Sequence, residues 1–140
     1  MYKDRHMPGK KKIREWAVAA LSKFRDTAEV TIRIVDEAES KQLNEKWRRA
    51  KGATNVLSFP AGGIEAMEPD LLGDIVICAP VVEREAKQQK KSYDAHLAHM
   101  VVHGMLHLMG YDHTTDQDAA SMESIETNIL KNLGYGNPYI

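Results

Sequence analysis

The segment "HGMLHLMGYDH", residues 103–113, places three histidines where they can bind one metal ion. His103 and His107 are four residues apart, so on a helix they share one face, with Cβ atoms about 6 Å apart. Gly110 lets the chain leave the helix and turn back, so that His113 can supply a third ligand. The spacing is that of the zinc-protease motif H-E-x-x-H-x-x-G-x-x-H, but Gly104 occupies the position of the glutamate general base.

The three imidazoles predict a catalytic metal site rather than a structural one. Three nitrogen ligands favour zinc, with nickel, copper and iron as alternatives, and they leave a fourth position for water whose pKa falls to near 7. Glycine in place of the glutamate argues against peptide hydrolysis, which needs a proton shuttle, and leaves room beside the metal for a bulky phosphodiester. We predict one zinc ion per chain, held by His103, His107 and His113, with His103 also a catalytic residue.

A buried helix must position these ligands. Between residues 95 and 109, every residue except the histidines and Gly104 is apolar, which predicts a helix covered on all sides. The histidines at 96, 99, 103 and 107 fall within roughly 80° of one another on that helix. Burying an unpaired imidazole costs a few kcal/mol, so the stripe needs partners. We expect His96 and His99 to support the ligands or line a pocket, and Asp94 to cap the helix.

Hydrophobic periodicity elsewhere predicts helices and short strands in a mixed order. Helices are expected over 9–25, 37–49, 80–90, 94–109 and 116–132, strands over 29–36, 55–59 and 71–79, and an exposed loop over 61–70. The strand at 71–79 is almost continuously apolar and is therefore expected to be central. The pattern predicts an α+β fold with a small mixed sheet packed with helices, in a single compact domain over residues 1–140.

Composition is that of an ordinary soluble globular protein, with 140 residues, 43% hydrophobic and 28% charged. A single cysteine, Cys78, excludes an internal disulfide and favours the cytoplasm. No apolar run approaches the roughly 20 residues that span a bilayer, and the first residues lack the apolar region of a signal peptide, so no membrane partner is expected.

Charge is distributed unevenly, although the net charge is only −1. Residues 1–14 and 41–51 are basic, whereas residues 112–126 carry five acidic residues and no lysine or arginine. Such runs are typical of solvated helix faces, but they would also suit a polyanion bound on one side of the molecule.

The segments "HMVVHGMLHLMGYDH", "TNVLSFP" and "LLGDIVIC" resemble, in order and spacing, the YbeY family of bacterial metal-dependent endoribonucleases. The resemblance runs from about residue 10 to the closing "LGYGNPYI". It implies a zinc ion on the three histidines and cleavage of single-stranded RNA. It also implies a role in maturing ribosomal RNA, notably the 3′ end of 16S rRNA, and in ribosome quality control, with the ribosome or ribosome-associated proteins as partners. Family members commonly begin with an additional strand, which "MYKDRHMPGK" does not predict.

The same resemblance assigns a functional arginine to Arg48, six residues before the threonine of "TNVLSFP", with its neighbour Arg49 as the alternative. The planar guanidinium of Arg48 suits a phosphate whose charge builds up during cleavage. Without the family, a solvated arginine at a helix end would be the preferred interpretation. Lys46, Arg49 and Lys51 would extend a basic track for the RNA backbone.

The segment "TNVLSFP" is expected to line the cleft beside the metal. Asn55 and Ser58 would offer polar contacts to substrate, and Phe59 would either stack on a base or belong to the core. Two other functions stay open on the residues alone. One is a metallopeptidase with the same ligand spacing, and the other is a non-catalytic, zinc-stabilised, ribosome-associated RNA-binding protein.

Overall fold

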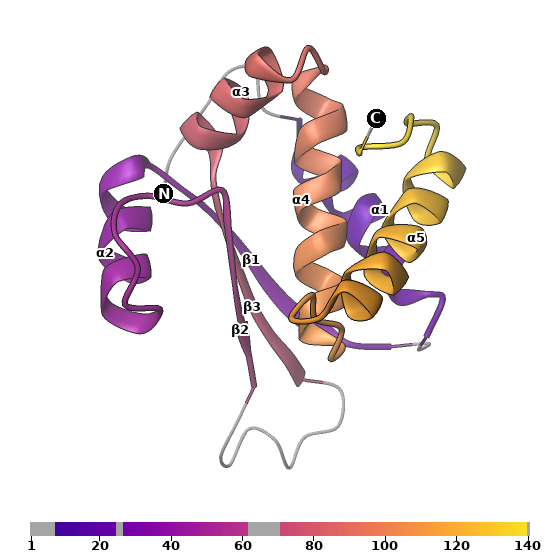
Figure 1. Ribbon diagram of the computed structural model, residues 1–140, viewed down its shortest axis with the longest axis horizontal. Coiled ribbons are helices and arrows are strands. Elements are labelled where there is room, and N and C mark those ends of the chain that lie inside the picture. The colour runs from indigo at the N-terminus through magenta and orange to yellow at the C-terminus, as the bar shows by residue number, and fades with distance from the viewer. Residues whose placement is uncertain (1–7, 25–26, 62–70, 140) are drawn as a thin grey trace.

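A computed structural model describes residues 8–24, 27–61 and 71–139 of the chain (Figure 1). Its helices are α1 (Lys10–Leu21), α2 (Glu37–Trp47), α3 (Ala79–Gln88), α4 (Tyr93–Leu108) and α5 (Asp116–Asn132), and its strands are β1 (Glu29–Val35), β2 (Val56–Pro60) and β3 (Leu71–Cys78). The predicted α+β class is confirmed, and each predicted helix and strand has its counterpart. Residues 62–70, most of the predicted exposed loop, lie outside the described residues. So do residues 1–7, most of the segment that does not predict the additional strand of the family. Within the described ranges, no helix combines the length and apolar character needed to cross a bilayer.

The sheet has the strand order β1-β3-β2, with β1 parallel and β2 antiparallel to β3. It is therefore mixed, and β3 is central, as its apolar sequence predicts. Alternate residues of β3 face opposite sides: Ile75 and Ile77 join the main core, whereas Val76 and Cys78 join a smaller cluster. Figure 1 shows α2 on one side of the sheet and α1, α4 and α5 on the other.

Helix α4 occupies the centre of the fold and contacts α1, α3, α5, β2 and β3. Leu97, Val101 and Leu106 are completely buried, which confirms the prediction of a covered helix. The predicted cap is wrong by two residues, because the helix begins at Tyr93 and Ser92 accepts the hydrogen bond from the Ala95 N–H at 3.0 Å. Asp94 instead accepts a hydrogen bond from Lys12 Nζ at 2.8 Å, which joins α4 to α1.

The chain reverses direction just after α4. Gly110 has φ +98°, in the left-handed region that glycine adopts at little cost, and the Tyr111 N–H returns to the Leu106 carbonyl at 3.0 Å. Thr115 then caps α5 by accepting from the Asp118 N–H at 3.0 Å. As a result α5 packs back against α4, and the turn carries His113 towards the histidines of α4.

Candidate metal centre

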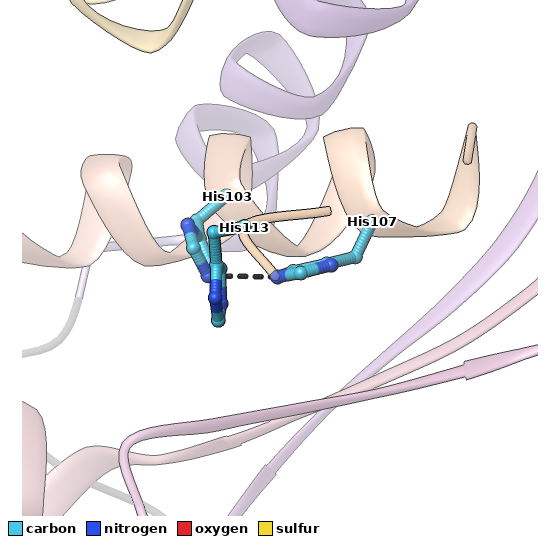
Figure 2. Close-up of side chains that lie close together, drawn as sticks. All are labelled: His103, His107 and His113. Carbon is cyan, nitrogen blue, oxygen red and sulfur yellow. Dashed lines mark hydrogen bonds between the residues drawn. The ribbon is translucent and has the colours of Figure 1, made fainter. Parts of the chain in front are cut away.

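Three histidine side chains converge where the turn after α4 folds back (Figure 2). His103 and His107 project from successive turns of α4, and His113 comes from the segment that follows it. One ligand nitrogen from each lies within 4.8 Å of the others. The ring centroids are 4.5 Å apart for His103 and His107, 5.1 Å for His107 and His113, and 5.7 Å for His103 and His113.

This geometry fits a single metal ion. The Nε2 atoms of His103 and His107 lie 3.0 Å apart. Two nitrogens bound to a tetrahedral zinc at 2.0–2.1 Å are separated by about 3.3 Å, so these rings need only a small adjustment. Burial, followed by the nearby rings of His103 and His113, lowers the pKa of His107, which favours the neutral imidazole that a metal requires.

A buried carboxylate from α5 orients the first of these ligands. Glu126 is 0% exposed, and its Oε1 lies 2.6 Å from His103 Nδ1. Its other oxygen, Oε2, contacts His99 Nε2 at 2.8 Å and the Tyr139 hydroxyl. Burial by itself would raise the pKa of Glu126, but the hydrogen bonds from His103, His99 and Tyr139 outweigh it and lower the pKa to about 2.

The charge on Glu126 fixes how His103 presents its nitrogens. An ionised carboxylate only accepts hydrogen bonds, so His103 must carry its proton on Nδ1. The lone pair of His103 Nε2 then points to the group formed with His107 and His113. A carboxylate behind a ligand histidine is a recurrent arrangement in metal sites, where it sets the tautomer and strengthens the ligand.

The other two histidines of the stripe also contact carboxylates. His96 is 3% exposed, and its Nε2 lies 2.9 Å from Glu85 Oε1, while His99 contacts Glu126. Burial lowers the pKa of His96. The buried histidines of α4 therefore have two acidic partners, Glu85 from α3 and Glu126 from α5.

The three converging histidines open onto a pocket between α4, β2 and the end of α2. Its lining includes Arg48, Ser58, Pro60, Tyr111 and Asp112. The Arg48 guanidinium donates a hydrogen bond to the Ser58 carbonyl and lies 5.7 Å from the ring centroid of Phe59. A guanidinium group and a histidine group that could bind a metal ion therefore share one cavity, an arrangement that suits a phosphodiester.

Comparison with known proteins agrees with this geometry. The family model described as endoribonuclease YbeY matches residues 3–134. The chain belongs to the YbeY endoribonuclease family. The solution structure of TM1509 from Thermotoga maritima is similar, with 29% sequence identity and a TM-score of 0.65, over 90% of this chain and 85% of that one. As a YbeY-family protein the chain is a metal-dependent endoribonuclease of rRNA processing.

In this YbeY-family protein, Gly104 does not clear space beside the metal, and that interpretation is wrong. The position is buried against the sheet, where an added Cβ would lie 3.0 Å from Ile75 Cγ2. The Gly104 carbonyl accepts a hydrogen bond from Ser58 Oγ at 3.2 Å. Because α4 and β3 approach closely, a side chain at this position would be in tight contact with Ile75, and glycine avoids that contact.

The remaining predicted residues lie in three places: Asn55 and Ser58 at the pocket, Phe59 against the core, and Arg49 on the exposed surface. Asn55 and Ser58 line the pocket, but the Asn55 side chain also donates to Glu85 Oε1 at 3.1 Å and accepts from the Val56 N–H at 2.7 Å. Phe59 packs against the smaller core cluster. Neither Phe59 nor Arg49 is among the described residues that line the pocket.

The sequence analysis does not predict Glu126 as a site residue, because Glu126 lies at the end of the acidic run at 112–126. A signal was nevertheless present. Glu126 follows Met122 by four residues and precedes Ile129 by three, so it lies on the apolar face of α5. An acid on a buried helix face, in a chain with a buried histidine stripe, indicates a pairing between the two.

Proposed function

We propose that the protein is a zinc-dependent, single-strand-specific endoribonuclease that matures the 3′ end of 16S rRNA and takes part in ribosome quality control. We further propose that it acts in the cytoplasm with the ribosome or ribosome-associated proteins as partners. The observation that supports the catalytic proposal is the convergence of His103, His107 and His113 in a pocket shared with Arg48.

The proposed roles follow from the contacts of each residue. When bound, the zinc ion supplies Lewis-acid chemistry that polarises a phosphoryl oxygen and makes water more acidic. His103 offers Nε2 because Glu126 holds its Nδ1 proton. The Arg48 guanidinium has five N–H donors and donates to the Ser58 carbonyl. Its remaining N–H groups can neutralise charge on the phosphate.

A second pocket supports the preference for single strands. Gly110 and Tyr111 line both the metal pocket and an adjoining apolar one, which also contains Phe24, Leu72 and Leu108. The Phe24 ring is 5.4 Å from that of Tyr111 and the residue is 41% exposed. An unpaired base can stack on such an aromatic surface, whereas a base within a duplex is already stacked and paired.

The Phe24→Ala variant is expected to raise KM for a single-stranded oligonucleotide by about 5- to 150-fold, since stacking of one base contributes roughly 1–3 kcal/mol. The value of kcat should change little, because Phe24 does not line the metal pocket. Trp47→Ala is a matched control, because Trp47 is 60% exposed but lines neither pocket. Equal rises in KM for both variants would contradict the stacking role.

The proposed function as a whole is tested with the purified full-length protein. Elemental analysis should find one zinc per chain, chelation should abolish cleavage of single-stranded RNA, and added zinc should restore it. A duplex of the same sequence should be cut at least about ten times more slowly, because its bases cannot reach a stacking pocket. If only another divalent metal restored cleavage, zinc would be excluded as the catalytic metal. If the duplex were cut at the same rate as the single strand, specificity for single strands would be excluded.

The two rival functions give different results in the same preparation. Chelator-sensitive digestion of casein would support a metallopeptidase, although Gly104 stands where such a peptidase has its glutamate general base. Binding of RNA without cleavage by the zinc-loaded protein would support the non-catalytic RNA-binding protein. The histidine group opens onto a pocket, and among the described residues it includes no fourth protein donor, which supports the enzyme.

A further inference from the structure

The C-terminal tail, residues 133–139, folds back from α5 towards α4 (Figure 1). Gly134 has φ +94° and the Tyr135 N–H returns to the Leu130 carbonyl at 2.9 Å, which ends α5 and redirects the chain. The Tyr135 ring then packs edge-on against Trp16 of α1, with centroids 6.3 Å apart. Further along, the Pro138 carbonyl accepts a hydrogen bond from Lys91 Nζ. The tail is thus held at two places before Tyr139.

Tyr139 reaches the carboxylate that supports the metal centre. Its hydroxyl donates to Glu126 Oε2, the oxygen that also accepts from His99 Nε2 at 2.8 Å. Its ring packs edge-on against the His99 ring, with centroids 5.3 Å apart. Burial and the hydrogen bond to Glu126 both raise the pKa of Tyr139, so its hydroxyl remains protonated and acts as a donor.

The two oxygens of Glu126 therefore have separate partners. Oε2 is occupied by His99 and Tyr139, which leaves Oε1 for His103 Nδ1 at 2.6 Å. Glu126 is fully buried, so a donor that is lost from Oε2 leaves a buried charged oxygen with one protein partner fewer. The donors on Oε2 therefore help to hold the orientation of the carboxylate that faces His103.

We propose that Tyr139 is a positioning residue of the metal centre. Through Glu126 it holds the His103 proton on Nδ1, and so presents His103 Nε2 to the metal. The tail is the element that delivers this hydroxyl, with Lys91 and Trp16 as its anchors. This inference rests on the proposed metal site of His103, His107 and His113 and adds a partner to it that lies 36 residues from His103 in sequence.

The expected effect is on metal affinity and on the tautomer of His103. Loss of a partner behind a ligand typically weakens metal binding by 10- to 100-fold. Tyr139 acts through one intermediate residue, so Tyr139→Phe should weaken zinc binding by about tenfold, at the lower end of that range. In the zinc-free protein the fraction of His103 with its proton on Nε2 should rise.

The test compares two variants of the full chain that each lose one tail hydroxyl. Tyr139→Phe removes the donor to Glu126, whereas Tyr135→Phe makes the same chemical change beside Trp16, away from the metal centre. Zinc affinity is measured by competition with a chelator, and the His103 tautomer by ¹⁵N NMR of the zinc-free protein. We expect both quantities to change in Tyr139→Phe and neither to change in Tyr135→Phe.

A merely structural role for Tyr139 would give another pattern. It would lower the melting temperature while leaving zinc affinity and the His103 tautomer at their wild-type values, and that result would overturn the inference. Lys91→Met provides a further test, because it frees the tail without touching Glu126 and should weaken zinc binding in the same direction. If the wild-type chain binds no zinc through its three histidines, the proposed function itself fails, which is a distinguishable outcome.

Discussion

The His113→Ala variant is expected to lose RNA cleavage by at least about 10³-fold while the chain remains folded. His113 is the third member of the metal-binding group, and a site with two remaining histidines holds zinc poorly. Loss of the metal removes several kcal/mol of transition-state stabilisation, and each 1.36 kcal/mol corresponds to a factor of ten in rate. Folding should survive because His113 is exposed on a turn rather than packed in the core.

Cleavage of a single-stranded oligonucleotide and the zinc content per chain are measured on the same samples. Thr114→Ala is the matched control, since Thr114 is also exposed, follows His113 directly and is not part of the histidine group. It should retain zinc and activity. Full cleavage by a zinc-free His113→Ala variant would contradict a catalytic metal, and a variant that loses only thermal stability would favour the RNA-binding protein.

The part of the site that the sequence predicts is the part built by local geometry. His103 and His107 share a helix face because they are four residues apart, and Gly110 permits the turn that brings in His113. The helices and strands follow from hydrophobic periodicity in the same way. The buried α4 and the central β3 are predicted because each is apolar along its length, which requires cover on all sides.

The remainder depends on side chains that meet only after the elements have packed. Glu126 reaches His103 from another helix, and Tyr139 reaches Glu126 from the end of the chain. No local pattern specifies which buried acid faces which histidine. Gly104 shows the opposite difficulty. The motif predicts that Gly104 leaves room beside the metal, whereas in the structure the position faces Ile75, where the helix packs on the sheet.

The Arg48→Glu variant is expected to reduce cleavage by about 10³-fold or more without unfolding the protein. Arg48 is the C-cap residue that follows α2, is exposed, and brings a guanidinium to the pocket where we propose that the phosphate binds. An arginine that neutralises transition-state charge in phosphoryl transfer contributes about 10³- to 10⁵-fold, and a glutamate adds repulsion to that loss. The structural cost is small, because Arg48 gives up one hydrogen bond to Ser58 and a contact with Phe59, about 1 kcal/mol each.

Arg49→Glu separates this specific role from general attraction of RNA. It makes the same change of charge one residue away, but Arg49 is not among the described residues that line the metal pocket. It should therefore raise KM only a few-fold, in a salt-dependent manner, and leave kcat unchanged, because it can contact only the RNA backbone. Rates are compared at saturating RNA, with melting temperatures as the check on folding. Retained cleavage by Arg48→Glu together with loss in Arg49→Glu would move the functional role to Arg49, whereas equal losses would indicate non-specific electrostatics.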